Sequence, residues 1–324
     1  MFTQEEVIKA TQANVIGKSY AASFKIHSVS QNSKKIQKGD LFVAIQGGRF
    51  DGHQFLEEAF QAGAAAALVQ AGHMDCSKFS KNLLFEVHDT IQALGDLAHV
   101  YRQRFSIPIL AVTGSNGKTT TKDLIAALLG KQFHVFKTTG NLNNLIGVPF
   151  TLFELKPSDE VAVIEMGMSL PFEIKRLSEI ARPTAGLITN IGQAHLETMG
   201  SKAKIAEAKG ALFMSLPKDG IAFINLDDPY LTPFVKTMSD RCEVITYGMK
   251  SDAALFQGKI VDHRGIAGIR MKCRWKKTNS FKEGSLEFDF SLPGEHNAHN
   301  AVAAIAVAIR CGVDSQKFKL ALES

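Results

Sequence analysis

The sequence predicts an α/β protein of two domains. We expect a small N-terminal α/β domain over residues 1–86 and a larger domain over residues 87–324, with a mostly parallel sheet and a side antiparallel sheet. Short apolar runs alternate with helical stretches, which is the pattern of parallel strands covered on both faces. Residues 252–292 instead alternate polar and apolar side chains between turns, which is typical of antiparallel strands. The length of 324 residues and the 45% share of hydrophobic residues allow two cores.

The charge balance favours small anionic ligands over nucleic acid. There are 37 Lys and Arg residues against 32 Asp and Glu residues, a net charge of +5, and the basic residues are spread along the chain. The densest basic stretch, residues 270–277, alternates with apolar residues. This spacing indicates a strand with one solvated face rather than a nucleic-acid patch. We therefore expect no nucleic-acid partner.

The chain carries no signal for export or for a membrane. The four cysteines are far apart, which suggests neither a disulfide framework nor a zinc site. Thr3 and Glu6 have capping-box spacing, so residues 1–10 predict a helix start rather than a secretory signal. No apolar run approaches the ~18 residues of a membrane span. We expect a cytoplasmic monomer without membrane insertion.

The N-terminal domain is predicted to begin with that first helix. Gly39 and Asp40 lead into a strand over residues 41–45, which is followed by a helix at 55–62 and a strand at 65–69. The glycines between 46 and 52 are consistent with plain turns. The next helix, residues 88–104, leads into the second domain.

Residues 109–121 form the centre of the second domain, because an apolar run breaks there into a glycine loop and then a helix over 118–129. Backbone N–H groups of such a loop, a lysine and the helix N-terminus together cradle phosphate. Thr119 stands where a P-loop hydroxyl reaches magnesium. The loop is shorter than the general pattern, whose first glycine would fall at Val112, and an ordinary turn with a solvated Lys118 is the alternative. The cradle residues are Gly114, Ser115, Asn116, Gly117, Lys118, Thr119 and Thr120.

Polar residues follow each of three further predicted strands, at 161–164, 185–188 and 221–224. These residues are Glu165, then Asn190 and His195, then Asn225, Asp227 and Asp228. Because parallel strands end at one edge of a sheet, where ligands bind, we expect all of them beside the phosphate cradle. A loop rich in asparagine, residues 138–144, offers further amides, and the apolar helix after it carries Pro149.

Several of these residues also have plainer interpretations. The position of Glu165 next to the phosphate cradle favours a role as a magnesium ligand, although an isolated acid at a strand end is more often a helix cap or a solvated charge. His195 by itself is more often structural, and Lys209 by itself is a solvated helix lysine. Asn297 and Asn300 are consistent with caps of a very apolar final helix over 301–309.

The motifs together resemble the Mur ligase family over essentially the whole chain. Residues 113–120 resemble the family's Thr-Gly-x-Asn-Gly-Lys-Thr loop, and residues 141–149 resemble its Asn-x-Asn-Asn-x-Ile-Gly-x-Pro segment. Residues 165–167 match Glu-x-Gly, where the branch that adds the third peptide residue would carry Glu-Val-Ser-Ser. Two further blocks are similar, at 190–201 and at 208–210.

The resemblance implies an ATP site with magnesium. Lys118 and Thr119 would hold the phosphates and the metal, while Glu165 and His195 would serve magnesium sites. Lys209 would be the family lysine that is often carbamylated. Asn297 and Asn300 would approach the adenine, with Asn225, Asp227 and Asp228 near the nucleotide.

The resemblance also implies a UDP-sugar site in the N-terminal domain, where residues 39–55 match the Gly-Asp-Leu-Phe-x-Ala and Asp-Gly-His-x-Phe blocks. Relatives read Thr-Asp-Ser-Arg where this chain has residues 31–34, so the uridine contacts there depart from the pattern. The implied substrate residues are Asn32, Ser33, Lys34, Gly47, Asp51, His53, Asn141, Asn143 and Asn144.

The implied reaction is the ATP-dependent addition of D-Ala-D-Ala to UDP-MurNAc-tripeptide through an acyl phosphate, in peptidoglycan precursor synthesis. Asn143 and Asn144 are candidates for orienting the substrate. Family members continue into a third domain that holds the acceptor, so we expect a truncated ligase without ligation activity. The alternatives are another amino-acid-adding Mur ligase, a folate-type polyglutamate ligase, and a P-loop switch or transport ATPase. UDP-sugar binding separates the last two from the first interpretation.

Overall fold

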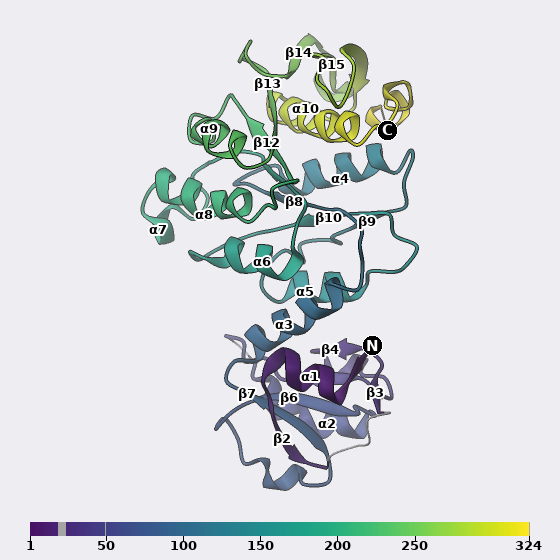
Figure 1. Ribbon diagram of the computed structural model, residues 1–324, viewed down its shortest axis with the longest axis vertical. Helices are drawn as coiled ribbons and strands as arrows, with labels where there is room; N and C mark the ends of the chain where they lie inside the picture. Colours follow the sequence, from purple (N-terminus) through teal and green to yellow (C-terminus); the bar gives the residue numbers. More distant parts are fainter. Residues whose placement is uncertain (19–23, 49, 324) are drawn as a thin grey trace. The chain divides into compact units, whose positions relative to one another are not determined.

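The computed structural model describes residues 1–18, 24–48 and 50–323, which form two compact units (Figure 1). One unit comprises Met1–Phe105 together with Pro149–Glu154, and the second comprises the rest of the described chain. The predicted α/β class is confirmed in both units.

The first unit is built on a five-stranded sheet of order β2-β7-β6-β5-β4. Neighbouring strands from β4 to β7 are parallel, and β2 runs antiparallel to β7 at one edge. β1 and β3 pair separately. The strands are β1 (Phe2–Thr3), β2 (Asn14–Gly17), β3 (Lys25–Ile26), β4 (Val29–Ser30), β5 (Leu41–Val43), β6 (Ala66–Gln70) and β7 (Leu83–Val87). The helices are α1 (Gln4–Thr11), α2 (Leu56–Gln61) and α3 (Thr90–Arg102).

The first helix begins as predicted. The Thr3 hydroxyl accepts a hydrogen bond from Glu6 N at 3.1 Å, and the Glu6 carboxylate accepts one from Thr3 N at 2.8 Å. This reciprocal capping box satisfies two amides that helix geometry leaves without a partner.

The units divide at a different place from the predicted boundary after residue 86. The division falls after Phe105, because α3 packs on α1 and β6 of the first unit. An amphipathic helix next to a boundary can serve either domain, and only its contacts decide which one it joins.

The second unit contains a nine-stranded sheet of order β16-β15-β14-β13-β12-β11-β8-β10-β9. The pairs from β9 to β14 are parallel, whereas β14, β15 and β16 form an antiparallel meander. The meander therefore continues the edge of the main sheet. The strands are β8 (Ile109–Thr113), β9 (Val135–Lys137), β10 (Val161–Glu165), β11 (Ala185–Ile188), β12 (Ile221–Asn225), β13 (Glu243–Gly248), β14 (Phe256–His263), β15 (Ile269–Trp275) and β16 (Gly284–Phe290).

Helices cover both faces of this sheet (Figure 1). α4 and α10 pack side by side on one face, where the alanine-rich middle of α10 is buried against strand residues such as Val112 and Tyr247. α6 and α8 pack together on the opposite face, where Leu212 lies against Gly186 of β11. The helices of the second unit are α4 (Lys118–Leu129), α6 (Glu173–Ala181), α7 (Leu196–Met199), α8 (Lys202–Met214), α9 (Pro233–Ser239), α10 (Glu295–Arg310) and α11 (Lys319–Leu322). Most of α5 (Gly147–Phe153) belongs to the first unit.

The basic stretch at 270–277 behaves as its alternation predicts. In β15 the apolar side chains are buried, whereas Arg270, Lys272 and Arg274 are exposed. Arg270 pairs with Glu287 on the neighbouring strand at 3.0 Å. The stretch therefore has one solvated face in an antiparallel sheet.

A helix with both the length and the apolar character to cross a membrane is not found in the described part of the chain.

Candidate active site

A glycine loop joins β8 to α4 at the place where the sequence predicts a phosphate cradle. Gly117 is the N-cap of α4 with φ 78°, and Gly114 has φ 149°. A Cβ on Gly114 would lie 1.9 Å from Thr189 Oγ1, so only glycine fits there. The loop thus presents backbone and a helix N-terminus where an anion binds.

The loop is fixed by the segment that follows β11. Ser115 N donates to Asn190 O at 2.9 Å, and Ser115 Oγ accepts from Gly192 N at 2.8 Å. Asn116 N donates to Asn190 Oδ1 at 3.1 Å, while Thr189 Oγ1 donates to Asn116 O at 2.6 Å. These bonds hold the cradle in shape before any ligand arrives, which lowers the ordering cost of binding.

Two lysines converge on one carbonyl of this loop. Lys118 Nζ donates to Gly114 O at 2.9 Å and to Ser115 O at 3.3 Å. Lys209 Nζ, from the middle of α8, donates to the same Gly114 O at 3.1 Å. Lys209 is therefore a buried part of the cradle, with 1% of its surface exposed, and not a solvated helix lysine.

Burial lowers the pKa of both lysines. For Lys209, burial and then the charge of Lys118 lower the pKa to about 7. Burial also lowers the pKa of Lys118, and the charge of Glu165 opposes that shift. The Lys209 amine is therefore partly neutral near pH 7, which makes it a nucleophile that an ordinary lysine is not.

Glu165, the last residue of β10, is a buried carboxylate with one satisfied oxygen. Its exposed fraction is 1%, its Oε1 accepts from Asn143 Nδ2 at 2.8 Å, and its backbone N donates to Thr138 Oγ1 at 2.9 Å. Within the described residues, Oε2 has no hydrogen-bond partner, and neither does Thr113 Oγ1 at the end of neighbouring β8. An unsatisfied buried carboxylate oxygen is costly, and a divalent cation bound by oxygen ligands would satisfy it. The residues present fit a magnesium ion.

A cavity of 620 Å³ opens beside the cradle, between the loops after β8, β11 and β12 and the start of α10. This volume is in the range of small-molecule sites. Of the polar residues expected beside the cradle, Asn190, Asn225, Asp227 and Asp228 line this cavity, whereas Glu165 and His195 do not. The lining side chains are Asn116, Thr189, Asn190, Ile191, Lys202, Asn225, Asp227, Asp228, Pro229, Tyr230, Tyr247, Lys250, His296, His299, Asn300 and Ala303, together with Gly117.

The predicted acids of this region act mainly as loop anchors. Asp228 accepts from Ile191 N at 2.6 Å and from Tyr230 N at 2.9 Å. Asp227 accepts from the amides of Lys250 and Ser251, and Asn225 Nδ2 donates to Thr189 O at 2.9 Å. Asp227 and Asp228 line the cavity, but their carboxylate oxygens accept hydrogen bonds from backbone N–H groups of the neighbouring loops.

The two asparagines of α10 differ in their surroundings. Asn300 is 5% exposed and its Oδ1 accepts from Thr121 Oγ1 at 3.1 Å, so it ties α10 to α4. A Cβ on Gly117 would lie 2.5 Å from the same Asn300 Oδ1. Asn297 Nδ2 donates to Pro293 O at 2.9 Å, and Asn297 is not in the cavity lining. The helix begins at Glu295, earlier than residue 301, and its N-cap is Gly294 without a side-chain hydrogen bond, so the plainer expectation that the two asparagines cap it is wrong.

Sequence reasoning missed several cavity residues. Lys202, Tyr230, Lys250 and His299 line the cavity without belonging to any motif. Lys202 and Tyr230 lie close in the sequence to the polar clusters at 190–201 and 225–228, and this proximity was their only signal, whereas Lys250 had none. His299 could have been found from its place between Asn297 and Asn300.

Other predicted residues are not gathered at Glu165. His195 is exposed at the N-cap of α7 with φ 64°, and across the described ranges no hydrogen bond or ion pair of its side chain is present. Thr119 is exposed and Thr120 half-buried in the first turn of α4. Asn144 Oδ1 accepts from Ile146 N and Gly147 N and so caps α5, while Asn141 is exposed.

The substrate residues implied for the first unit lie in two turns. Asn32 caps a 3-10 turn by accepting from Lys34 N at 3.0 Å, and within that turn Ser33 is buried whereas Lys34 is exposed. Gly47 N donates to Phe50 O at 2.8 Å, which closes the loop before Asp51.

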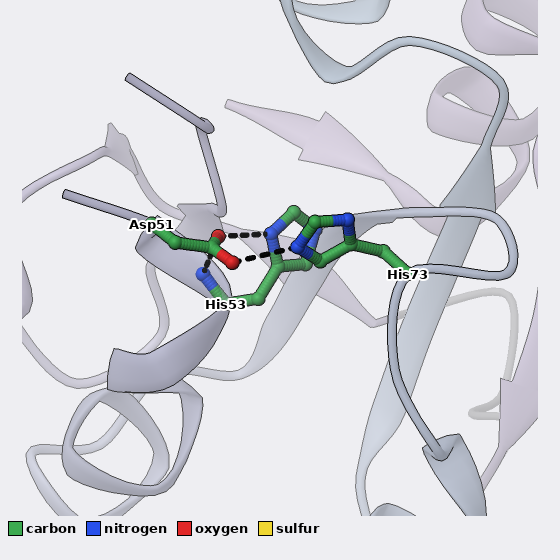
Figure 2. A group of neighbouring side chains, drawn as sticks. All are labelled: Asp51, His53 and His73. Carbon is green, nitrogen blue, oxygen red and sulfur yellow. Dashed lines mark hydrogen bonds and ion pairs between the residues drawn. The ribbon is translucent and has the colours of Figure 1, made fainter. Parts of the chain in front are cut away.

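Asp51 joins His53 of its own motif to His73, which the sequence analysis did not single out (Figure 2). Asp51 Oδ1 lies 2.7 Å from His53 Nδ1, and Asp51 Oδ2 lies 2.6 Å from His73 Nε2. Desolvation opposes these hydrogen bonds, but together they lower the pKa of Asp51 to about 2. Burial lowers the pKa of His53, against the pull of Asp51.

The ligand atoms of these three residues lie within 4.8 Å of one another, close enough to hold a metal. However, Gln70 N donates to His53 Nε2 at 3.0 Å. A neutral His53 then carries its proton on Nδ1, which points at Asp51 and not at a cation. The cluster is a hydrogen-bonded brace between the Asp51 loop and β6.

Comparisons with known proteins agree with this arrangement. A family model for the Mur ligase middle domain matches residues 112–308, and one for the Mur ligase family catalytic domain matches residues 25–102. A UDP-N-acetylmuramoyl-tripeptide–D-alanyl-D-alanine ligase of Bacillus subtilis is 38% identical over 95% of this chain. The chain spans 63% of the length of that relative.

Solved structures are similar as well. A MurF structure from Acinetobacter baumannii has a TM-score of 0.87 and 29% identity, covering 100% of this chain and 68% of that chain. A MurF ligase from Thermotoga maritima in complex with ADP has a TM-score of 0.78 and 28% identity, covering 94% of this chain and 67% of its own. The glycine loop, the buried Lys209 and the buried Glu165 all lie in the stretch that the middle-domain model matches, and this chain belongs to the Mur ligase family.

Proposed function

We propose that this chain belongs to an ATP-dependent, ADP-forming ligase that adds D-Ala-D-Ala to UDP-MurNAc-tripeptide in peptidoglycan precursor synthesis. One observation carries the proposal. Lys118 and Lys209 converge on the glycine loop while Glu165 keeps a buried oxygen without a hydrogen-bond partner. The ammonium of Lys118 and the amides of the loop suit phosphate, and the free carboxylate oxygen suits a cation that accompanies it.

The choice of substrate rests on the relatives. The B. subtilis protein carries that activity in its name, and the T. maritima structure holds ADP. We assign the first unit to UDP-MurNAc-peptide binding and the second to ATP, with residues 1–86 as the core of the former. The turns at Asn32 and Gly47 and the brace at Asp51 would shape the sugar-nucleotide site.

In the proposed reaction the terminal carboxylate of the tripeptide attacks the γ-phosphorus and ADP leaves. The amine of D-Ala-D-Ala then attacks the acyl carbon, phosphate leaves, and the amine loses a proton. Lys118 and the amides of the loop bind the phosphates, and Asn143 orients Glu165. Magnesium would be held by Glu165, with the Thr119 hydroxyl in the first turn of α4 as a further candidate ligand, and would neutralise phosphate charge. His195 is a further candidate for this metal, provided that its loop turns inward.

Lys209 is assigned as a carbamate. Its amine is buried and its pKa is about 7, so a neutral form is available to attack CO₂. The ammonium first loses one proton, and the neutral amine then forms an N–C bond to CO₂ and loses a second proton. The product is an anion, which attracts a cation that the ammonium would repel. The adenine would occupy the cavity beside Asn300 and His299, with Asp227 and Asp228 holding its loops.

Calorimetric titration tests the proposal. ATP with Mg²⁺ and UDP-MurNAc-tripeptide are each expected to bind the purified protein, in separate titrations. A tetrahydrofolate polyglutamate is the control ligand and is expected not to bind. Binding of the folate, or of ATP without any binding of the UDP-sugar, would contradict the assignment.

A further inference from the structure

Lys122 is a buried lysine that no motif or proposed step uses. It lies one helical turn after Lys118 on the same face of α4, and its side chain is 2% exposed. Lys118 reaches the glycine loop, whereas Lys122 reaches toward the end of β10. A fully buried ammonium is rare unless a charge compensates it.

Two carboxylates share this ammonium. Lys122 Nζ is 3.7 Å from Glu165 Oε2, the oxygen without a hydrogen-bond partner, and 3.6 Å from Asp123 Oδ1. Both separations are longer than a hydrogen bond. Lys122 therefore balances the charge of Glu165 without occupying its oxygen.

The second carboxylate differs from the first in its surroundings. Asp123 is 46% exposed and pairs also with Lys137 at 2.6 Å, whereas Glu165 is 1% exposed. Asp123 is thus solvated and already paired with Lys137, while the ion pair that Glu165 makes is with Lys122, and the charge of Lys118 acts on it as well. The attraction between the buried pair is strong because little water screens it.

We propose that Lys122 is a positioning residue and the resident counter-ion of Glu165. Its ammonium leaves Oε2 open until a divalent cation binds, and then shifts toward Asp123. The proposal rests on the proposed function, since it takes Glu165 as the cation ligand. A cation near Oε2 takes over the neutralisation of Glu165 and repels the ammonium. Asp123, at nearly the same distance, is the carboxylate that can receive it.

Thermal denaturation at pH 8.5 tests this role with Lys122→Met, Glu165→Gln and the double variant, each without ligand and with ADP plus Mg²⁺. Without ligand, Lys122→Met is expected to melt several degrees below the wild type, because it leaves a bare buried carboxylate. Glu165→Gln added to Lys122→Met is expected to restore most of that loss. The control Lys137→Met, at the solvated lysine on Asp123, is expected to change the melting temperature little.

The response to the cation separates positioning from packing. The rise in melting temperature caused by Mg²⁺ at constant ADP is expected to be larger for Lys122→Met than for the wild type, since the cation replaces the missing charge. An equal rise in both proteins overturns the proposal, as does a double variant that stays as unstable as Lys122→Met. If Lys122→Met does not fold, the double variant is expected to fold, and its failure to do so also overturns the proposal.

Glu165→Gln alone tests the proposed function independently. This variant is expected to show a smaller Mg²⁺-dependent rise in melting temperature than the wild type. An undiminished rise in this variant removes Glu165 as the cation ligand and contradicts the proposed metal site. If Glu165→Gln shows a reduced Mg²⁺-dependent rise in melting temperature while the wild type and Lys122→Met show equal rises, only the proposed role of Lys122 is overturned.

Discussion

Lys118 and Lys209 donate hydrogen bonds to the same carbonyl oxygen, that of Gly114, at 2.9 and 3.1 Å. The two lysines come from α4 and from the middle of α8, on opposite faces of the sheet, so the tertiary fold alone brings them together. While both amines are protonated, they create a local positive potential beside the glycine loop. Burial first, and then the charge of Lys118, explain why Lys209 loses its proton more easily than an ordinary lysine.

Removing the charge of Lys118 is expected to weaken ATP binding without unfolding the protein. Lys118→Ala should lower the affinity for ATP by about 10- to 100-fold, the range for losing a charge-assisted hydrogen bond. The melting temperature should change little, because the side chain contributes little packing. Isothermal titration measures the affinity, with Lys131→Ala, an exposed lysine just beyond α4, as the matched control. An unchanged ATP affinity in Lys118→Ala would refute the cradle.

Gly114→Ala is expected to abolish nucleotide binding and to destabilise the second unit. The new Cβ would meet Thr189 Oγ1, and φ 149° by itself costs about 1–3 kcal/mol for a residue with a side chain. Gly140→Ala is the control, since Gly140 has φ 57° and open space around it, and it should cost only about 1 kcal/mol. Chemical denaturation and ATP titration measure both effects. Equal losses of ATP affinity and of unfolding free energy in the two variants would show that the contact with Thr189 affects neither property.

The carbamate on Lys209 is expected to be visible by ¹³C NMR in protein equilibrated with ¹³C-bicarbonate. The signal should grow as the pH rises through about 7, because only the neutral amine reacts and its pKa lies there. Lys209→Ala should lack the signal, whereas Lys204→Ala, an exposed lysine of the same helix, should retain it. The assignment would be disproved if the wild type showed no carbamate signal, or if its carbamate signal persisted in Lys209→Ala.

Acid is expected to loosen the first unit at the His53 brace. Burial places the folded pKa of His53 below its usual 6.5, so the unfolded chain binds the proton more readily. Stability from the neutral form is therefore fully present above about pH 6.5 and declines as the pH falls below it. Asp51, with a pKa of about 2, stays charged over this window.

The Gln70 amide reports this change directly, because a protonated His53 Nε2 can no longer accept its hydrogen bond. Its hydrogen-exchange protection, corrected for the intrinsic rate, should fall between pH 8 and pH 5 in the wild type. In His53→Gln the protection should be lower at pH 8 and should vary less with pH. Wild-type protection that is constant over this range would contradict the titration of His53.

Local sequence patterns determined which elements form. The apolar run of β8, the glycines and the absence of helix breakers predict α4 over the residues it occupies, and the capping box at Thr3 marks the start of α1. β10, β11 and β12 each begin and end within a residue of their apolar runs. The short strands β2 and β9 carry too little periodicity to be predicted.

The sequence also determined where the chemistry gathers. Polar residues after parallel strands must meet at one edge of the sheet, and the cavity lies there. What the sequence could not determine is how each side chain is used. Asp228 anchors the loop of Ile191, whereas Glu165 keeps an oxygen free, although both are acids after a strand.

Tertiary structure alone decided the charges and partners of the site. Lys209 and His53 have ordinary pKa values in an extended chain, and only burial beside particular neighbours lowers them. His73 joins Asp51, and α3 joins the first unit, through contacts between residues distant in sequence. Backbone preference and apolar periodicity act over a few residues, so the sequence displays them. Desolvation and pairing act across the fold, so they exist only once the chain is packed.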